Sequence, residues 1–145
     1  MKLKNLPIPE AHIFGIVLGV LLHLLFEVNT FNSTWTGHLV GWPLIVPGTV
    51  LSIWAAIEAG EIDISSPQEL VTSGPYTYSR NPMYVGWSLI YLGIAFVMNS
   101  LWLIVLFPLV MIYIHFIDIP KEERFLERTF GSQFSEYRKH VRKYL

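Results

Sequence analysis

The residues best suited to chemistry lie in a short polar and aromatic stretch between long apolar runs. This stretch, residues 74–86, reads GPYTYSRNPMYVG. Arg80 offers a planar guanidinium that can bind a carboxylate or a phosphate through two parallel hydrogen bonds. Asn81 and Pro82 suit the N-cap and the first position of a helix, whose free backbone N–H groups can receive an anion. The stretch therefore predicts a binding site for a polar group at the start of a helix.

A second group of ionisable residues, Glu122 and Glu123, follows after a long apolar segment. No Asp, Glu, Lys or Arg occurs at residues 82–117, and that length suffices for two membrane crossings. Two crossings return the chain to the same face, so the two carboxylates are expected beside Arg80. A simpler interpretation remains open, in which Arg80 extends to the lipid headgroups and the tyrosines form an interfacial belt.

The composition predicts that most of the chain lies in lipid. Of the 145 residues, 52% are hydrophobic and 14% are charged, and the mean hydropathy is +0.46. Residues 11–26 and 28–57 also lack charged side chains. The net charge of −1 argues against a nucleic-acid partner, which needs a basic surface. The absence of cysteine excludes disulfides, thiolate metal sites and cysteine nucleophiles, and no metal site is expected.

The pattern predicts an all-α integral membrane protein with four transmembrane helices, at about residues 8–28, 39–59, 82–98 and 101–119. Pro47 is expected to kink the second helix, and the fourth is expected to end before Pro120. The last two helices would form a tight hairpin that reverses at residues 99–100. We expect the first helix to be retained, because the residues after it offer no cleavage pattern for a signal peptide.

Every Lys and Arg falls on one side of these crossings or at its border, which predicts that both termini are cytoplasmic. After Pro120 the chain becomes an amphipathic cytoplasmic tail that is expected to be helical. Its apolar residues recur every three to five positions and are expected to rest at the membrane interface, in contact with lipid. They are Phe125, Phe130, Phe134, Tyr137, Val141 and Tyr144.

The sequence resembles the isoprenylcysteine carboxyl methyltransferase and phospholipid methyltransferase group, in particular its bacterial-type members. The resemblance rests on GPY at 74–76, RNPMYVG at 80–86, the two glutamates at 122–123 and FG at 130–131. It covers residues 71–145 closely. It implies one methyltransferase-like domain over residues 1–145, with 71–145 as the cofactor-binding core. It also implies S-adenosylmethionine as the cofactor and the cell membrane of a bacterium or archaeon as the location.

The resemblance also implies the residues of the site. Arg80, Tyr84 and Glu123 are expected to be catalytic. The cofactor is expected to contact Tyr76, Arg80, Asn81, Pro82, Tyr84, Gly86, Glu122 and Glu123. His115 is added on position, because it lies about two turns before Glu122 on the hairpin that would wall the pocket. Asn81 departs from the eukaryotic carboxyl methyltransferases, which have His between Arg and Pro, so no imidazole can act at this position here.

Methyl transfer from a sulfonium needs positioning and desolvation more than a protein nucleophile. The resemblance implies a lipophilic acceptor, namely an isoprenylcysteine-type carboxylate, a related lipid or a small thiol. An amine acceptor would first lose a proton to a base such as Glu122 or Glu123. The residues alone do not choose among these acceptors, and the oligomeric state stays open. Asp118 can cap a helix, border the pocket or pair with Arg80 or Arg124, and pairing is the simplest expectation.

Two other functions fit parts of the pattern. A steroid-reductase-like membrane enzyme shares the Arg-x-Pro-x-Tyr-x-Gly motif and binds NADPH, but such enzymes commonly have Glu where this chain has Trp87, and they are usually longer. A non-catalytic four-helix membrane protein could keep the scaffold alone. The joint presence of Arg80, Tyr84, Glu122 and Glu123 argues for a cofactor site instead.

Overall fold

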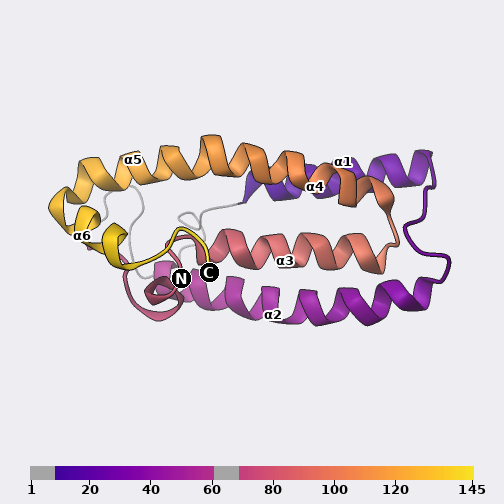
Figure 1. Cartoon of the computed structure of the whole chain (residues 1–145), viewed down its shortest axis with the longest axis horizontal. Coiled ribbons are helices and arrows are strands. Elements are labelled where there is room, and N and C mark those ends of the chain that lie inside the picture. Colours follow the sequence, from indigo (N-terminus) through magenta and orange to yellow (C-terminus); the bar gives the residue numbers. More distant parts are fainter. Residues whose placement is uncertain (1–8, 61–68) are drawn as a thin grey trace.

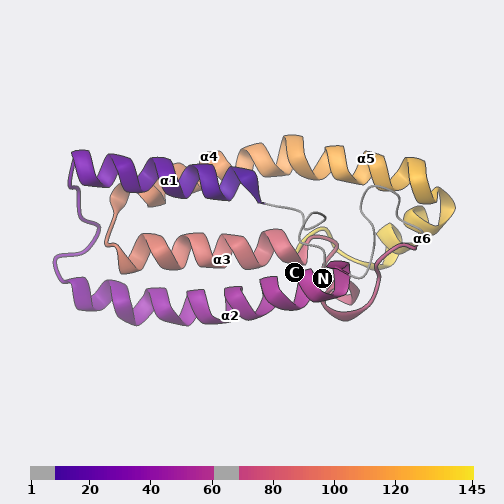
Figure 2. The same ribbon diagram turned by 180° about the vertical axis from the view of Figure 1, so that it is seen from behind.

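The computed structural model describes residues 9–60 and 69–145, and the regular elements in these ranges are helical. In Figures 1 and 2 the first four α-helices lie side by side as a bundle, and α5 continues α4 beyond its end. The elements are α1 (Glu10–Leu25), α2 (Thr34–Gly60), the 3-10 turn η2 (Gly74–Thr77), α3 (Pro82–Val97), α4 (Leu101–Tyr113), the π-helical turn η3 (Ile114–Asp118), α5 (Ile119–Phe130) and α6 (Ser132–His140).

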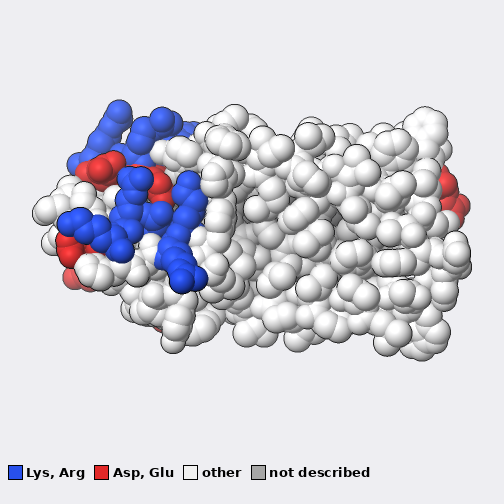
Figure 3. Space-filling model, viewed as in Figure 1, with Lys and Arg blue, Asp and Glu red and all other residues white. Residues whose placement is uncertain are grey.

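The bundle has the surface expected of a membrane protein. Two helical segments, Thr34–Gly60 and Leu101–Phe130, are long and apolar enough to cross a bilayer, whereas α1 and α3 have 16 residues each. Large apolar side chains cover the outside of the bundle, including Phe14 with 69% of its surface exposed and Leu39 with 71%. Figure 3 shows a wide uncharged zone, with Lys and Arg gathered at one end.

The fourth helix does not end before Pro120, so that expectation was wrong. The helical path continues from α4 through η3 into α5 and ends at Phe130. Within the π-helical turn the N–H of Ile119 donates to the carbonyl of Ile114, five residues back. This wider turn relieves the clash of the proline ring with the preceding turn, and Pro120 then stands at the start of α5. One continuous path therefore carries Glu122 and Glu123 beyond the bundle.

The second helix starts at Thr34, earlier than expected, and continues through Pro43 and Pro47. It packs backbone to backbone against α3 through small residues. A Cβ atom on Gly41 would lie 2.6 Å from the carbonyl oxygen of Gly93. A Cβ atom on Gly48 would lie 2.7 Å from the carbonyl oxygen of Gly86 in the same way. This close approach sets the position of α3, whose first residues belong to the candidate site.

Asn99 stabilises the turn between α3 and α4, at the end of the bundle that lies opposite the first residues of α3. Its φ of 53° is a left-handed conformation that Asn tolerates better than most residues. The Asn99 Oδ1 accepts hydrogen bonds from the backbone N–H groups of Thr30 (3.1 Å) and Phe31 (2.7 Å), and its Nδ2 donates to the carbonyl of Phe31 (2.9 Å). The turn is thereby tied to the linker between α1 and α2.

Candidate functional site

The loop before α3 is anchored to the end of α2. The Ser73 hydroxyl donates to the Oε2 atom of Glu58 at 2.7 Å, and the Thr77 hydroxyl donates to the carbonyl of Gly74 at 2.7 Å. Gly74 has a φ of 56°, and a Cβ atom there would lie 2.6 Å from the Glu58 side chain. Glycine is therefore required at this position both for its backbone conformation and for space. These contacts position the chain that leads to Arg80.

The C-terminal segment holds the other side of this loop. The backbone N–H of Arg80 donates to the carbonyl of Arg142 at 2.9 Å, and Asn81 Nδ2 donates to the carbonyl of Lys143 at 2.9 Å. The Tyr137 hydroxyl donates to the carbonyl of Tyr76 at 2.7 Å. Asn81 does occupy the N-cap position of α3, but its side chain binds the C-terminal segment and makes no capping hydrogen bond. Hydrogen bonds from residues 137–143 thus fix the conformation of the loop at residues 76–81.

The tail differs from the expectation that its aromatic residues face lipid at the interface. Phe134 is 1% exposed, and Phe130 and Tyr137 line the same cavity as Arg80. The reason is the turn at Gly131, with a φ of 52°, which ends α5 and lets α6 fold back toward the loop. The amphipathic pattern of the tail is real, but much of its apolar side packs against protein.

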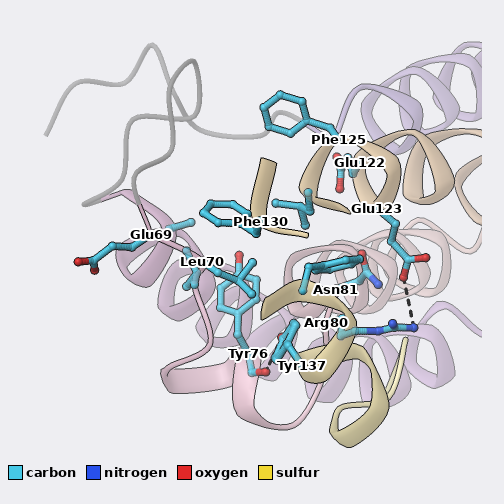
Figure 4. A pocket seen from close by; sticks show the side chains of 14 residues that line it. Glu69, Leu70, Tyr76, Arg80, Asn81, Glu122, Glu123, Phe125, Phe130 and Tyr137 are labelled. Atoms are coloured by element: carbon cyan, nitrogen blue, oxygen red, sulfur yellow. Dashed lines mark hydrogen bonds and ion pairs between the residues drawn. The ribbon is translucent and has the colours of Figure 1, made fainter. Parts of the chain in front are cut away.

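A cavity of about 210 Å³ lies between the loop, α5 and α6. Its volume is several times the roughly 30 Å³ that one water molecule occupies, so it can take part of a small molecule. Apolar and aromatic side chains form most of its wall; Arg80, Glu122 and Glu123 lie at one side, and Glu69 lies at the opposite side (Figure 4). The lining includes Tyr76, Arg80, Asn81, Glu122, Glu123, Phe125, Leu126, Phe130, Phe134 and Tyr137.

The guanidinium of Arg80 forms one ion pair within the described residues and has two further buried nitrogen atoms that lack an acceptor there. Its Nη2 lies 3.2 Å from the Oε1 of Glu123, and the two side chains are 10% and 14% exposed (Figure 4). This contact is an ion pair whose alignment falls short of a hydrogen bond, because Oε1 has no hydrogen-bond donor among the described residues. The Nε and Nη1 atoms of Arg80 are also buried and have no acceptor within residues 9–60 and 69–145. Buried donors of this kind normally have partners, so Arg80 can bind a further anion.

Glu122 is held by a different residue. The Tyr84 hydroxyl donates to the Oε1 atom of Glu122 at 2.7 Å and so joins the first turn of α3 to α5. A smaller pocket of about 60 Å³ lies beside this bond and includes Pro9 and Pro82 in its lining. It shares Arg80 and Glu122 with the larger cavity. The two glutamates therefore bind different residues: Glu123 pairs with Arg80, and Glu122 accepts a hydrogen bond from Tyr84.

Burial keeps the two tyrosines of the loop and tail in their neutral form. Desolvation raises the pKa of Tyr76 above its usual range, and the nearby Tyr137, Glu122 and Glu58 raise it further. Desolvation also raises the pKa of Tyr137 to about 12, although the positive charge of Arg80 opposes this shift. Both hydroxyls therefore remain protonated near neutral pH and can donate hydrogen bonds.

The structure brings together most of the residues that the sequence indicated. Tyr76, Arg80, Asn81, Glu122 and Glu123 line the larger cavity, and Pro82 and Tyr84 line the smaller one.

Two of the residues indicated by the sequence lie elsewhere. Gly86 packs against α2, where its Cβ position meets Ser52 and lies 2.8 Å from the carbonyl oxygen of Gly48. His115 Nδ1 lies 3.0 Å from the Tyr144 hydroxyl, and the two rings stack. The expected pairing of Asp118 with Arg80 or Arg124 is wrong, because Arg80 pairs with Glu123 and Asp118 forms no ion pair within residues 9–60 and 69–145.

His12 was not indicated by the sequence, because it lies too near the expected membrane interface to be distinguished from other interfacial residues. It is fully buried, and its Nε2 lies 3.1 Å from the Ser88 hydroxyl. The centroid of its ring is 6.1 Å from that of Tyr84. The Ser88 hydroxyl also donates to the carbonyl of Tyr84 at 2.7 Å. His12 thus packs behind Tyr84, and only the position of α1 against α3 reveals it.

Known proteins place the chain in a family. Residues 36–133 match the phospholipid methyltransferase family. The chain belongs to this family. It is 33% identical over 125 residues to the cobalt-zinc-cadmium resistance protein CzcN of Cupriavidus metallidurans, with 84% of this chain and 56% of that protein covered. It is 30% identical over 135 residues to the protein-S-isoprenylcysteine O-methyltransferase of Schizosaccharomyces pombe, with coverages of 88% and 56%.

A plant relative aligns over almost the whole chain. The protein-S-isoprenylcysteine O-methyltransferase A of Arabidopsis thaliana is 29% identical over 151 residues, with 97% of this chain and 76% of the relative covered. The chain spans a little over half the length of the bacterial and yeast relatives. These matches confirm the resemblance that the motifs at residues 74–86 and 122–123 indicated.

Proposed function

We propose that this protein is a membrane methyltransferase that binds S-adenosylmethionine in the cavity beside Arg80 and methylates a lipophilic acceptor. The observation that carries the proposal is the guanidinium of Arg80. It is nearly buried, it pairs with Glu123, and its Nε and Nη1 atoms have no acceptor among the residues that the structure describes. Membership of the phospholipid methyltransferase family supports the same reaction class.

The side chains around the cavity have the chemistry that this cofactor requires. Arg80 would bind its carboxylate through Nε or through Nη1, because these two donors point in different directions and cannot both reach one carboxylate. Glu122 and Glu123 would accept hydrogen bonds from its ammonium or its ribose hydroxyls. The apolar and aromatic wall, which includes Phe130 and Tyr137, would contact the adenine. When bound, S-adenosylmethionine supplies a methyl group activated by its positively charged sulfur.

The residues of the chain would contribute positioning and exclusion of water. Arg80, Glu123 and Tyr84 are the residues we assign to the reaction centre. The Tyr84 hydroxyl holds the carboxylate of Glu122 in one orientation. The side chains of α6 close one wall of the cavity and keep bulk water away from the site. No protein nucleophile is needed, because the acceptor attacks the methyl group directly.

We also propose that α1, α2, α3 and the α4–η3 segment cross the membrane, with both termini in the cytoplasm of a bacterium or archaeon. Lys and Arg gather at the end of the molecule that carries the site, as Figure 3 shows. In this orientation the cofactor reaches the cavity from water, and the acceptor reaches it from surrounding lipid.

The test is a titration of the purified full chain in detergent with S-adenosylmethionine, S-adenosylhomocysteine and NADPH, each in parallel. We expect saturable binding of the first two, with competition between them, and no binding of NADPH. Binding of NADPH without S-adenosylmethionine would replace the proposal with the reductase alternative. Binding of none of the three would favour a non-catalytic role. A methyl-transfer screen across prenylated cysteines, amine lipids and small thiols would then identify the acceptor class.

A further inference from the structure

The last part of the chain carries a group of basic side chains that the candidate site does not use. Residues 136–145 contain four Lys and Arg residues and a single acidic residue, Glu136. Lys139 forms an exposed ion pair with Glu136 at 3.1 Å, whereas the other three form no ion pair within residues 9–60 and 69–145. We call the four residues the basic patch; they are Arg138, Lys139, Arg142 and Lys143.

The basic patch lies where the apolar surface of the bundle ends. Figure 1 shows the C-terminal segment, in yellow, returning from α6 to the start of α3. Arg142 pairs with Ser79 there in a short parallel bridge, three residues before Pro82 begins α3. Figure 3 shows basic side chains up to the border of the wide uncharged zone. The phosphate groups of a bilayer lie directly outside its hydrocarbon core, so the patch lies at their level.

Two exposed apolar side chains accompany the basic patch. Leu145 is 68% exposed, and Tyr78 is 67% exposed beside Ser79, the residue that pairs with Arg142. Basic side chains together with exposed aromatic and aliphatic ones are typical of segments at a membrane interface, where the rings lie among the head groups and the cations contact phosphate. A nucleic acid fits less well, because the net charge of the chain is −1. The surface therefore fits an anionic lipid.

The backbone of the basic patch also holds the loop of the candidate site. The carbonyl of Arg142 accepts a hydrogen bond from the backbone N–H of Arg80 at 2.9 Å, and the carbonyl of Lys143 accepts one from Asn81 Nδ2 at 2.9 Å. The side chain of Arg142 is exposed, so it can bind a partner while its carbonyl holds the loop. A contact that fixes these side chains therefore also fixes the backbone beside Arg80.

We propose that the basic patch binds the phosphate groups of anionic phospholipids, and that this contact strengthens the attachment of residues 141–143 to the loop at residues 79–81. The patch places four positive charges within six residues, and anionic lipid removes the repulsion among them. Because the attachment fixes the backbone at Arg80, an anionic membrane also tightens the cofactor site. The effect on the cofactor rests on the proposed function, whereas the lipid contact rests on the position of the patch at the membrane.

The test measures deuterium exchange of the full chain in nanodiscs of phosphatidylcholine, alone or mixed with phosphatidylglycerol. The amide of Arg80 is the main probe, because its hydrogen bond to the Arg142 carbonyl must open before it exchanges. A basic side chain near an anionic surface contributes about fivefold to such a contact. We therefore expect phosphatidylglycerol to slow this exchange roughly three- to tenfold. Added salt should reduce the effect, because it screens the charges.

The variants change the charge of the patch and leave its backbone in place. Arg138→Gln/Arg142→Gln should exchange like wild type in phosphatidylcholine and should lose most of the slowing by phosphatidylglycerol. Arg138→Lys/Arg142→Lys keeps both charges and should respond like wild type, which separates loss of charge from loss of fold. Arg124→Gln/Arg128→Gln makes the same change of charge at exposed positions of α5, outside the basic patch. This matched control should also respond like wild type.

Equal exchange in the two membranes, or slowing that survives Arg138→Gln/Arg142→Gln, would overturn the proposal. The same slowing by inorganic phosphate added to phosphatidylcholine nanodiscs would also overturn it, because the patch would then bind free phosphate. S-adenosylmethionine titration of the same nanodiscs gives an independent result, with an affinity expected to be roughly two- to fivefold higher beside phosphatidylglycerol. Slowed exchange without cofactor binding would reject the methyltransferase assignment and leave the lipid contact in place. Cofactor binding with equal exchange in the two membranes would reject only the lipid contact.

Discussion

A comparison of Arg80→Ala with Arg80→Met/Glu123→Leu separates the two roles that the structure gives the Arg80 side chain. Arg80 pairs with Glu123 at 3.2 Å, and its Nε and Nη1 atoms have no acceptor within residues 9–60 and 69–145. The Arg80→Ala variant loses both functions at once. Arg80→Met/Glu123→Leu replaces the pair by apolar side chains of similar length, so it restores packing without restoring the anion-binding donors. Arg80→Lys keeps the charge but loses the planar fork.

The magnitudes follow from burial and from the number of free donors. Leaving one member of a buried pair alone costs about 3–5 kcal/mol, and we take the low end because the two side chains are still 10% and 14% exposed. At about 2–4 °C per kcal/mol for a chain of this size, Arg80→Ala should lower the Tm by roughly 6–12 °C. One charge-assisted hydrogen bond from a free donor contributes about 1.5–3 kcal/mol to binding. The affinity for S-adenosylmethionine should therefore fall roughly 10- to 100-fold, since each 1.4 kcal/mol is about tenfold.

The assays are thermal unfolding and cofactor titration on the same detergent preparations. The double variant should recover most of the Tm but none of the affinity, and Arg80→Lys should lie between wild type and Arg80→Ala in both measurements. An Arg80→Ala protein that binds S-adenosylmethionine within about threefold of wild type would refute the assignment of the guanidinium to the site. A double variant that recovers affinity along with the Tm would show that Arg80 acts through folding alone.

Further predictions concern the frame around the site. Gly86→Ala should lower the Tm, at a cost of about 1–3 kcal/mol, because its Cβ would lie 2.8 Å from a backbone oxygen of α2. Gly60→Ala is the control and should leave the Tm unchanged, because its Cβ would meet nothing within 4 Å. Equal Tm values for the two variants would contradict the close packing of α3 on α2. Asn99→Ala should lower the free energy of unfolding by about 2–4 kcal/mol, because it loses three hydrogen bonds and places alanine at a φ of 53°. Asn99→Gly loses the same hydrogen bonds but relieves the backbone strain, so it should unfold at a higher temperature than Asn99→Ala. Tyr137→Phe removes the 2.7 Å bond to the Tyr76 carbonyl and should speed deuterium exchange in the loop before α3; unchanged exchange would show that the tail does not hold this loop.

Several features could be predicted from residue types and local spacing. The apolar runs and the Pro82 start of α3 identify helices, because both signals depend only on neighbours in the chain. The distance in sequence between Arg80 and Glu123 predicts their meeting once two helices of similar length reverse the chain between them. The motifs around these residues also indicated the family to which the chain belongs.

The path of the chain after α4 depended on interactions that local patterns do not encode. A proline usually ends a helix, but the π-helical turn before Pro120 lets the helix continue. The aromatic spacing of the tail predicts one apolar face and does not say whether lipid or protein covers it. The turn at Gly131 decides this, because it brings Phe134 and Tyr137 back to the loop.

The sequence by itself determined the apolar helices, the placement of Lys and Arg at one end and the residue types of the candidate site, since each follows from composition and short-range spacing. Only the tertiary structure decided that Arg80 pairs with Glu123 and that Tyr84 donates a hydrogen bond to Glu122. It also decided which aromatic side chains line the cavity. It also packed α1 against α4, and so placed Glu10 and Asp118 in the lining of one groove although more than a hundred residues separate them in sequence. The physical reason is that hydrogen bonds and ion pairs act over a few ångströms, so their partners are settled by packing between helices.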